Sequence, residues 1–289
     1  MYIVLSITGI LKSDKDLLAN INKTIRLCRQ CVHHYFEIVS HNIYPINRTF
    51  LCTAPYQNRK RMIQTMYTFS TKGKTISIFP NFEVNAPIIY LNTFSGERQK
   101  VYEAMQTAGC QPFTLVAISD LDWNNDMTPW DSPPAFKTAE PCTGGADDYL
   151  RLLTEEIIPT AEKQITGIPR WRGIAGYSLA GLFALYSIYQ TDLFSRVGSM
   201  SGSLWFPEIK EYIFSHEPKH WPECMYFSLG DKESKTRNPV LQSVRQNTEE
   251  IHDFYRGKGI DTVFQLNPGN HYNQAVERTA AGLCWLLSR

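Results

Sequence analysis

One serine in the sequence has neighbours suited to nucleophilic chemistry. Ser178 lies between Gly176 and Ala180, after an apolar β-type segment and before a segment with apolar residues at helical spacing. A strand, a tight turn and a helix with small residues two positions either side of a serine are typical of a nucleophile elbow. Ala180 replaces the usual second glycine, and its single methyl group is expected to fit there. The alternative interpretation is a helix-capping serine without chemistry.

Two later segments could supply partners for such a serine. Gly230 closes an apolar segment and is followed by Asp231 and Glu233, and a Pro-Gly turn precedes His271 just before the last helical segment. The chain order serine, acid, histidine is one of the known orders of a triad, in which the histidine takes the serine proton and the acid orients the histidine. Each partner also has a structural interpretation, the acids as solvated loop charges and the histidine as a helix cap.

These candidates require a scaffold that brings the ends of several strands together. From residue 62 onward, apolar β-type runs alternate with helical patterns. Runs such as FTLVAIS and PIIYL are apolar throughout, as expected for strands covered on both faces. A hairpin followed by repeated β-α units predicts an α/β fold, with a doubly wound, mostly parallel sheet, helices on both faces and no large cap domain. The predicted strands are 66–70, 75–79, 87–91, 113–119, 171–175, 196–199, 225–229 and 262–266, and the predicted helices are 97–109, 146–165, 179–190, 239–258 and 274–288.

The first part of the chain differs from the rest. Apolar residues at helical spacing between residues 17 and 39 predict an amphipathic helix, and an aperiodic linker follows it. Cys28 and Cys31 fall on the apolar stripe of this helix, which favours a structural role over a metal or haem site. We therefore expect an N-terminal helix and linker over residues 1–61 and a catalytic domain over residues 62–289.

Composition and charge exclude several classes of protein. Of the 289 residues 43% are hydrophobic and 20% are charged, which is enough for a sizeable core. Lys and Arg number 29 and Asp and Glu number 28, so a formal net charge of +1 offers no field that would attract nucleic acid or an anionic membrane. No run approaches the ~20 apolar residues of a membrane span, and the N-terminus lacks the basic region and cleavage site of a signal peptide.

The seven cysteines do not suggest a disulfide framework. Their odd number and scattered positions are typical of a reducing compartment, and we expect a cytoplasmic protein. No acidic cluster has the spacing of a calcium loop, so neither a metal nor a cofactor is expected. No feature of the sequence sets an oligomeric state.

The loop after the predicted strand 113–119 is a candidate substrate wall. In a parallel sheet it emerges at the same edge as Ser178, where ligands bind. The loop carries Trp123 and Trp130 among acids and prolines, and Trp205 follows the next strand on that side. We expect these tryptophans to contact substrate. Packing of the loop against the sheet edge is the alternative.

Taken in order, four motifs connect the chain to a known family. GYSLAGLFALY, SMSGSLWFP, SLGDKE and NPGNH resemble the putative-esterase branch of the α/β-hydrolases, which includes enterochelin (siderophore) esterases, feruloyl esterases, S-formylglutathione hydrolase and the antigen 85 mycolyltransferases. The resemblance covers roughly residues 62–289. It implies a serine hydrolase that cleaves carboxylic esters through an acyl-enzyme intermediate, with a small or medium ester of siderophore or feruloyl type as substrate.

The resemblance also implies roles for individual residues. It makes Ser178 the nucleophile and His271 the general base and acid. Relatives place the acid a few residues after the glycine that closes the late strand, which fits Glu233 better than Asp231, and Asp231 stays the alternative acid.

An oxyanion hole is the remaining part of such a site. The amide of Leu179, directly after the nucleophile, would supply one donor at the positive end of a helix. By analogy with relatives the second donor is the amide of Phe94, with Thr93 as the next candidate.

Two other functions remain open on the same fold. An acyltransferase would use the same acyl-enzyme with an alcohol acceptor, as the antigen 85 relatives suggest. A non-catalytic binding protein is the other possibility, suggested by Ala180 and by the unmatched N-terminal segment, and it would be favoured by Ser178 and His271 side chains that point apart.

Overall fold

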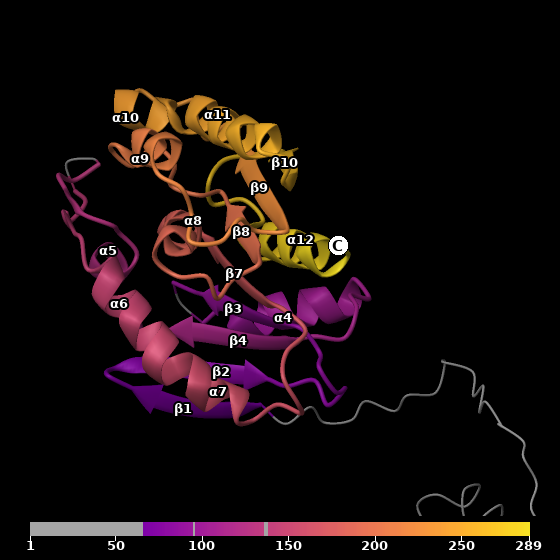
Figure 1. Cartoon of the computed structure of the whole chain (residues 1–289). Helices are drawn as coiled ribbons and strands as arrows, with labels where there is room; N and C mark the ends of the chain where they lie inside the picture. Colours follow the sequence, from indigo (N-terminus) through magenta and orange to yellow (C-terminus); the bar gives the residue numbers. More distant parts are fainter. Residues whose placement is uncertain (1–65, 95, 136–137) are drawn as a thin grey trace, which may run out of the picture. The chain divides into compact units, whose positions relative to one another are not determined.

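Eight strands form one sheet in the described part of the chain, which comprises residues 66–94, 96–135 and 138–289 of a computed structural model (Figure 1). They are β1 Tyr67–Thr71, β2 Lys74–Phe79, β3 Ile88–Asn92, β4 Thr114–Ser119, β7 Arg172–Tyr177, β8 Arg196–Met200, β9 Cys224–Gly230 and β10 Asp261–Asn267. Their spatial order is β1-β2-β4-β3-β7-β8-β9-β10. β2 pairs antiparallel with β1 and β4, and the remaining neighbours are parallel. The predicted mostly parallel sheet is confirmed.

The predicted N-terminal helix and linker lie outside the described residues. The same is true of Cys28 and Cys31, and of residues 62–65 at the start of the predicted catalytic domain. The division between residues 1–61 and 62–289 therefore stays a prediction.

Helices cover both faces of the sheet, as predicted. α4 and α12 pack on one face, and α6, α7, α8, α9 and α11 contribute to the core on the other face (Figure 1). Their bounds are α4 Arg98–Thr107, α6 Ala146–Leu152, α7 Ile158–Glu162, α8 Leu179–Gln190, α9 Ile209–Ser215, α11 Val244–Gly257 and α12 Ala275–Leu287.

β3 illustrates why the central strands are apolar on both sides. Ile88 and Tyr90 belong to the core cluster under α8, whereas Ile89 and Leu91 belong to the cluster under α4 and α12. Successive side chains of a strand point to opposite faces, so a strand covered by helices on both faces has no position left for exposed polar residues.

Short elements and helix interruptions depart from the predicted pattern. The predicted helix 146–165 contains a π-helical turn, η2 Leu153–Ile157, which ends two residues before Pro159 in the first turn of α7. Proline removes one amide donor, and its ring collides with the carbonyl group of the preceding turn. A wider π-helical turn relieves this collision. The sequence did not predict α5 Trp123–Asp126, α9, or the small sheet of β5 Asp131–Ser132 and β6 Cys142–Thr143, and it did not predict that 239–258 divides into α10 Pro239–Gln242 and α11.

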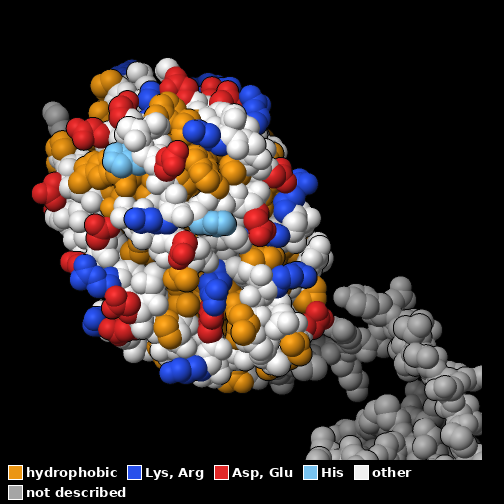
Figure 2. All heavy atoms as spheres, viewed as in Figure 1, with side chains coloured by type: hydrophobic (Ala, Val, Ile, Leu, Met, Phe, Trp, Pro, Cys, Tyr) orange, Lys and Arg blue, Asp and Glu red, His pale blue; other side chains and the backbone are white. Residues whose placement is uncertain are grey.

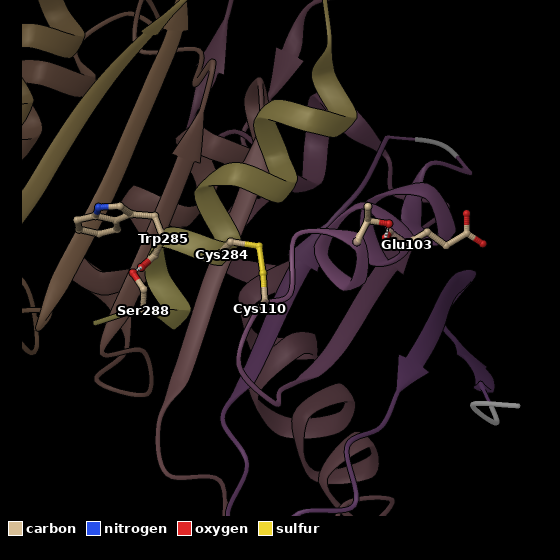
Figure 3. The surroundings of a disulfide bond; sticks show 6 residues. Glu103, Cys110, Cys284, Trp285 and Ser288 are labelled. Carbon is tan, nitrogen blue, oxygen red and sulfur yellow. Dashed lines mark hydrogen bonds between the residues drawn. A yellow bond between two sulfur atoms is a disulfide. The ribbon is translucent and has the colours of Figure 1, made fainter. Parts of the chain in front are cut away.

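A disulfide joins two distant parts of the chain, which the sequence did not predict. Cys110, in the loop after α4, is bonded to Cys284 on α12, and their Cα atoms lie 5.5 Å apart (Figure 3). The partners are separated by 174 residues, so spacing along the chain gave no indication of the pair. The expectation of reduced cysteines is wrong at this pair, whereas Cys142 and Cys224 are free.

The surface carries charges of both signs. On the face shown in Figure 2, acidic and basic side chains are interspersed and neither sign gathers in one large patch. This agrees with the formal net charge of +1. Within the described residues, no helix has the length and apolar character that crossing a membrane would require.

Candidate active site

Ser178 occupies a constrained turn between β7 and α8. Its backbone has φ of 61° and ψ of −126°, a conformation that a residue with a side chain adopts rarely and at a cost. The surrounding backbone holds it there. The Ser178 amide donates to the Met200 carbonyl at 3.1 Å, and the Ser178 carbonyl accepts hydrogen bonds from the amides of Gly181 and Ser203, each at 3.0 Å.

The small residues around Ser178 are required by close packing. A Cβ atom on Gly176 would lie 2.3 Å from the Cβ of Ala180 and 2.5 Å from its carbonyl carbon. Strand and helix can therefore approach only because residue 176 has no side chain, and the methyl group of Ala180 occupies the space that Gly176 leaves. A Cβ on Gly181 would lie 2.9 Å from the Ser199 hydroxyl oxygen.

The structure brings Ser178, His271 and Glu233 into one chain of hydrogen bonds. Ser178 Oγ lies 3.0 Å from His271 Nε2, and His271 Nδ1 lies 2.8 Å from Glu233 Oε2. These residues follow β7, β10 and β9, whose carboxyl ends share one edge of the parallel sheet. The serine and histidine side chains thus meet, which is the opposite of the arrangement expected for a non-catalytic protein of this fold.

Glu233 is buried and surrounded by donors. Its side chain is 5% exposed, and its Oε1 accepts from the Ser201 hydroxyl at 2.7 Å and the Gly230 amide at 2.6 Å. Burial raises the pKa of Glu233, but the hydrogen bond and charge of His271 together with these donors outweigh it and hold the pKa below its ordinary value. The carboxylate is therefore ionised and able to orient His271.

Asp231, the other acid predicted for this role, has a different position. Its Oδ1 accepts a hydrogen bond from the Gly269 amide at 2.8 Å, and its own amide donates to the Asn267 carbonyl at 2.7 Å. Asp231 therefore holds the turn that precedes His271, whereas Glu233 contacts the imidazole itself.

The two amides expected at an oxyanion hole belong to residues that follow neighbouring strands, Leu179 after β7 and Phe94 after β3. Leu179 is the first residue of α8, where amides lack partners within the helix and the helix dipole is positive. In the pairing of β3 with β7, Asn92 lies opposite Gly176, so the residues that follow each strand are neighbours. The Thr93 amide donates to the Ile118 carbonyl at 2.8 Å and is therefore occupied. Phe94 is then the candidate on this side.

Two of the three predicted tryptophans, Trp130 and Trp205, both pack against Phe206. Trp130 donates from Nε1 to the Pro207 carbonyl at 3.1 Å and lies with its ring centre 5.5 Å from Tyr212 and 5.8 Å from Phe206. Trp205 is half-buried and packs against Phe206 at 6.3 Å. The geometry of Trp130 fits the packing alternative.

The third tryptophan lies beside the candidate oxyanion loop. Trp123 contacts Phe94 edge to face, with ring centres 5.1 Å apart, and the Phe94 side chain is 67% exposed. On the histidine side, Tyr272 is 84% exposed and its ring centre lies 5.4 Å from that of His271. Exposed aromatic rings therefore lie in two places, Phe94 in the candidate oxyanion loop and Tyr272 beside His271.

Four residues that contact the hydrogen-bonded chain were missed by the sequence analysis, and one of them is Ser203, whose hydroxyl oxygen lies 3.3 Å from Ser178 Oγ. The Tyr177 hydroxyl donates to the His271 carbonyl at 2.7 Å, Ser201 binds Glu233, and Arg278 is 3% exposed beside them. A signal for Arg278 was present, because it shares a helical stripe with Gly282 and Leu286 and so falls on the buried face of α12. A charge on a buried face needs a partner.

No metal site accompanies these residues in the part of the chain that the structure describes. Within it, no group of three or more His, Cys, Asp or Glu side chains is arranged to hold a metal ion.

Comparison with known proteins places this chain within a family. The sequence model of the family described as "Putative esterase" matches residues 91–271, a span that includes Ser178 and Glu233 and ends at His271. The uncharacterized protein YbbA of Bacillus subtilis is 25% identical over 233 residues, which are 74% of this chain and 92% of YbbA.

Several solved structures share the fold. The siderophore hydrolase EstA from Aspergillus nidulans aligns with a TM-score of 0.63 and 17% identity over 83% of this chain and 99% of that one. An IroE-like serine hydrolase from Shewanella oneidensis gives a TM-score of 0.63 and 17% identity, covering 78% of this chain and 80% of that one. The enterobactin esterase FES from Shigella flexneri, in the presence of enterobactin, gives 0.57 and 16%, covering 78% and 58%. Such identities show likeness of fold.

Proposed function

The chain belongs to the putative esterase family and is an ester hydrolase, and from this premise we propose that it is a serine esterase that works through an acyl-enzyme on Ser178. The observation that carries the proposal is the continuous contact from Ser178 Oγ through the His271 ring to Glu233, at 3.0 and 2.8 Å. A serine hydroxyl is a weak nucleophile unless an adjacent base takes its proton, and this contact supplies the base.

Acylation uses His271 first as a base and then as an acid. As Ser178 Oγ attacks the ester carbonyl carbon, His271 Nε2 takes the hydroxyl proton, and the resulting imidazolium is stabilised by Glu233 at Nδ1. The tetrahedral intermediate then collapses with cleavage of the bond to the alcohol oxygen. His271 gives its proton to that oxygen, the alcohol leaves, and the acyl group stays on Ser178.

Deacylation repeats these steps with water. His271 takes a proton from the attacking water, the second tetrahedral intermediate collapses, and the proton returns to Ser178 Oγ as the carboxylic acid leaves. Both intermediates carry a negative oxygen, for which the amides of Leu179 and Phe94 are the proposed donors. The occupied Thr93 amide and the pairing of β3 with β7 support this choice.

Esters with an aromatic part are the proposed substrates. The exposed Phe94 ring, which packs against the partly buried Trp123, offers a surface on which a phenolic ring can pack, and Tyr272 offers another beside His271. The solved structures with a similar fold include a siderophore hydrolase and an enterobactin esterase. We therefore propose esters of the siderophore or feruloyl type over simple aliphatic esters.

A kinetic panel tests both parts of this proposal. The purified protein is assayed with ethyl butyrate as an aliphatic ester, a feruloyl ester and a catecholate siderophore, and products are analysed with and without an added alcohol, which separates hydrolysis from acyl transfer. We expect turnover that Ser178→Ala removes and a higher kcat/KM for the aromatic esters. Turnover that survives Ser178→Ala contradicts the mechanism.

A matched pair of variants tests the aromatic contact. Phe94→Ala removes the ring but keeps the amide, and should raise KM for the aromatic esters while leaving that for ethyl butyrate, an aliphatic ester, nearly unchanged. Phe82→Ala removes a ring that is also more than half exposed but precedes β3, at the opposite edge of the sheet, and should change neither. Equal effects of the two variants on aromatic esters would contradict the substrate class.

A further inference from the structure

We propose that Arg278, on α12, is a positioning residue that fixes both Glu233 and the turn carrying His271. This inference rests on the proposed serine esterase mechanism and adds a residue to it. Arg278 is only 3% exposed, and Ser178 is not among its hydrogen-bond partners. It acts through Glu233 and the backbone before His271.

The guanidinium group binds the turn that carries His271. Arg278 Nη2 donates to the Pro268 carbonyl at 2.9 Å, and Nη1 donates to the Asn270 carbonyl at 3.1 Å. The next carbonyl, that of His271, accepts from the Tyr177 hydroxyl at 2.7 Å. The backbone just before the imidazole is therefore held from α12 and from β7, which limits the directions in which the ring can point.

The same guanidinium group pairs with Glu233. Nη1 lies 3.3 Å from Glu233 Oε1, and the two side chains are only 2% and 5% exposed. Because Oε1 also accepts from Ser201 and Gly230, the carboxylate is held at this oxygen, and Oε2 is directed to His271. A buried ion pair that loses one partner leaves an uncompensated charge, so Arg278 also sets the charge that His271 experiences.

The close packing around Gly230 shows how tightly the end of β9, the His271 turn and Arg278 fit together. A Cβ atom on Gly230 would lie 2.4 Å from the Gly269 carbonyl oxygen and 3.1 Å from Arg278 Nη1. The end of β9 therefore approaches the His271 turn and the guanidinium group more closely than a side chain would permit. A planar fork that reaches two carbonyls and a carboxylate suits arginine, whereas lysine offers a point charge.

Arg196 is a matched control for the alternative in which Arg278 only stabilises the fold. That arginine is also buried, with 8% of its side chain exposed, and its Nη1 donates to the carbonyl of Leu286, near the other end of α12. Its acidic partner is Glu223 rather than Glu233. Arg196→Met should therefore weaken the anchoring of α12 without touching the hydrogen-bonded chain.

The pH profile separates positioning from stability. The titratable and charged groups that face Glu233 and His271 are Arg278 on α12, Tyr177 on β7, Asp231, which binds the Gly269 amide, and Tyr272, whose ring lies beside that of His271. Without Arg278 the negative charge of Glu233 is uncompensated and favours a protonated imidazole. On the acidic side of its pH profile kcat/KM rises as His271 loses a proton, and we call this rise the acid limb. Without Arg278 the acid limb should move to higher pH.

The experiment compares Arg278→Met, Arg278→Lys and Arg196→Met, each assayed for ester turnover across pH and for thermal unfolding. We expect Arg278→Met to lower kcat by about 10- to 100-fold, as loss of a residue that orients a catalytic group does, with little change in KM and an acid limb at higher pH. Arg278→Lys should return the acid limb to its wild-type pH and recover part of kcat. Arg196→Met should lower the unfolding temperature and leave kcat and the limb unchanged.

Distinct outcomes overturn the inference and the mechanism. Unchanged kcat and limb in Arg278→Met, or equal losses in Arg196→Met, would overturn the positioning role. Should Arg278→Met fail to fold, Arg278→Lys decides, because a fall in kcat at unchanged unfolding temperature supports the role and full activity refutes it. Wild-type turnover that does not depend on Ser178 would instead refute the proposed function.

Discussion

At the scale of single residues, two neighbouring carboxylates have different hydrogen-bond partners. Glu233 and Asp231 lie two positions apart after β9, yet one contacts the His271 ring and the other holds the Gly269 amide. Burial alone would make a carboxyl group hard to ionise. The donors gathered around Glu233 reverse that tendency, which is what the proposed mechanism needs from it.

Amide substitutions of the two acids should separate their roles. Glu233→Gln removes the charge that stabilises the imidazolium, and we expect kcat to fall by about 10²- to 10⁴-fold. Asp231→Asn keeps an acceptor near the Gly269 amide, and we expect kcat within about 5-fold of wild type with a modest loss of stability. Steady-state kinetics and thermal unfolding check both. The reverse ranking would make Asp231 the functional acid.

The lowered pKa of Glu233 predicts a pH dependence of stability. The unfolded state, in which Glu233 has its ordinary value near 4.5, binds a proton at higher pH than the folded state does. This contribution is therefore fully present above that value and is lost as the pH falls through the lower folded value. In urea unfolding, wild type should exceed Glu233→Gln by about 3 kcal/mol near neutral pH, and the gap should shrink below pH ~4.5. A gap that widens on acidification contradicts the assignment.

At the scale of elements, the sequence predicted what local patterns determine. The apolar runs gave the eight strands and the major helices, and the small residues around Ser178 gave its turn. Patterns of this kind did not reveal α5 and α9, whose short lengths depend on tertiary contacts, or the π turn at Leu153–Ile157. The choice of Glu233 came from family resemblance, since the sequence alone left Asp231 equally possible. The role of Arg278 depends on partners far away in the chain.

The close approach of β7 and α8 gives a prediction for a single methyl group. Gly176→Ala places a Cβ 2.3 Å from that of Ala180, so the turn at Ser178 must shift. We expect a loss of about 1–3 kcal/mol or more in the free energy of unfolding together with most of the activity.

The end of α11 offers the control. A Cβ on Gly257 meets no atom within 4 Å, so Gly257→Ala should keep full activity and unchanged or slightly higher stability. Denaturant unfolding and esterase assays compare the two. Equal tolerance at both positions would show that the packing around Ser178 is not needed.

At the scale of the whole described domain, distant segments meet at α12. This helix follows the His271 turn, contributes Arg278 to Glu233, fills the core against α4, and carries Cys284 of the disulfide. The site therefore depends on the last helix of the chain as much as on the turn at Ser178. The family match, which ends at His271, stops short of this helix.

The disulfide should stabilise the domain and leave the chemistry intact. Cys110→Ser with Cys284→Ser removes a cross-link that closes a loop of 174 residues, and we expect a loss of about 2–5 kcal/mol in the free energy of unfolding. Because the bond lies away from Ser178, kcat in native buffer should stay near wild type.

Two controls accompany this experiment, treatment with a thiol reductant and substitution of a free cysteine. A thiol reductant should lower wild-type stability to that of the double variant and leave the double variant unchanged, and Cys142→Ser, at a free cysteine, should behave as wild type. Identical stability of wild type and double variant under oxidising conditions would show that the bond does not contribute.

Covalent labelling by a fluorophosphonate tests most directly that Ser178 is activated by His271. Intact mass and peptide mapping should find one adduct, on Ser178, formed in wild type and absent in Ser178→Ala. His271→Ala should slow its formation by at least about 10³-fold while thermal unfolding confirms a folded protein. Labelling at another residue, or at Ser178 with a rate that does not depend on His271, would contradict the account.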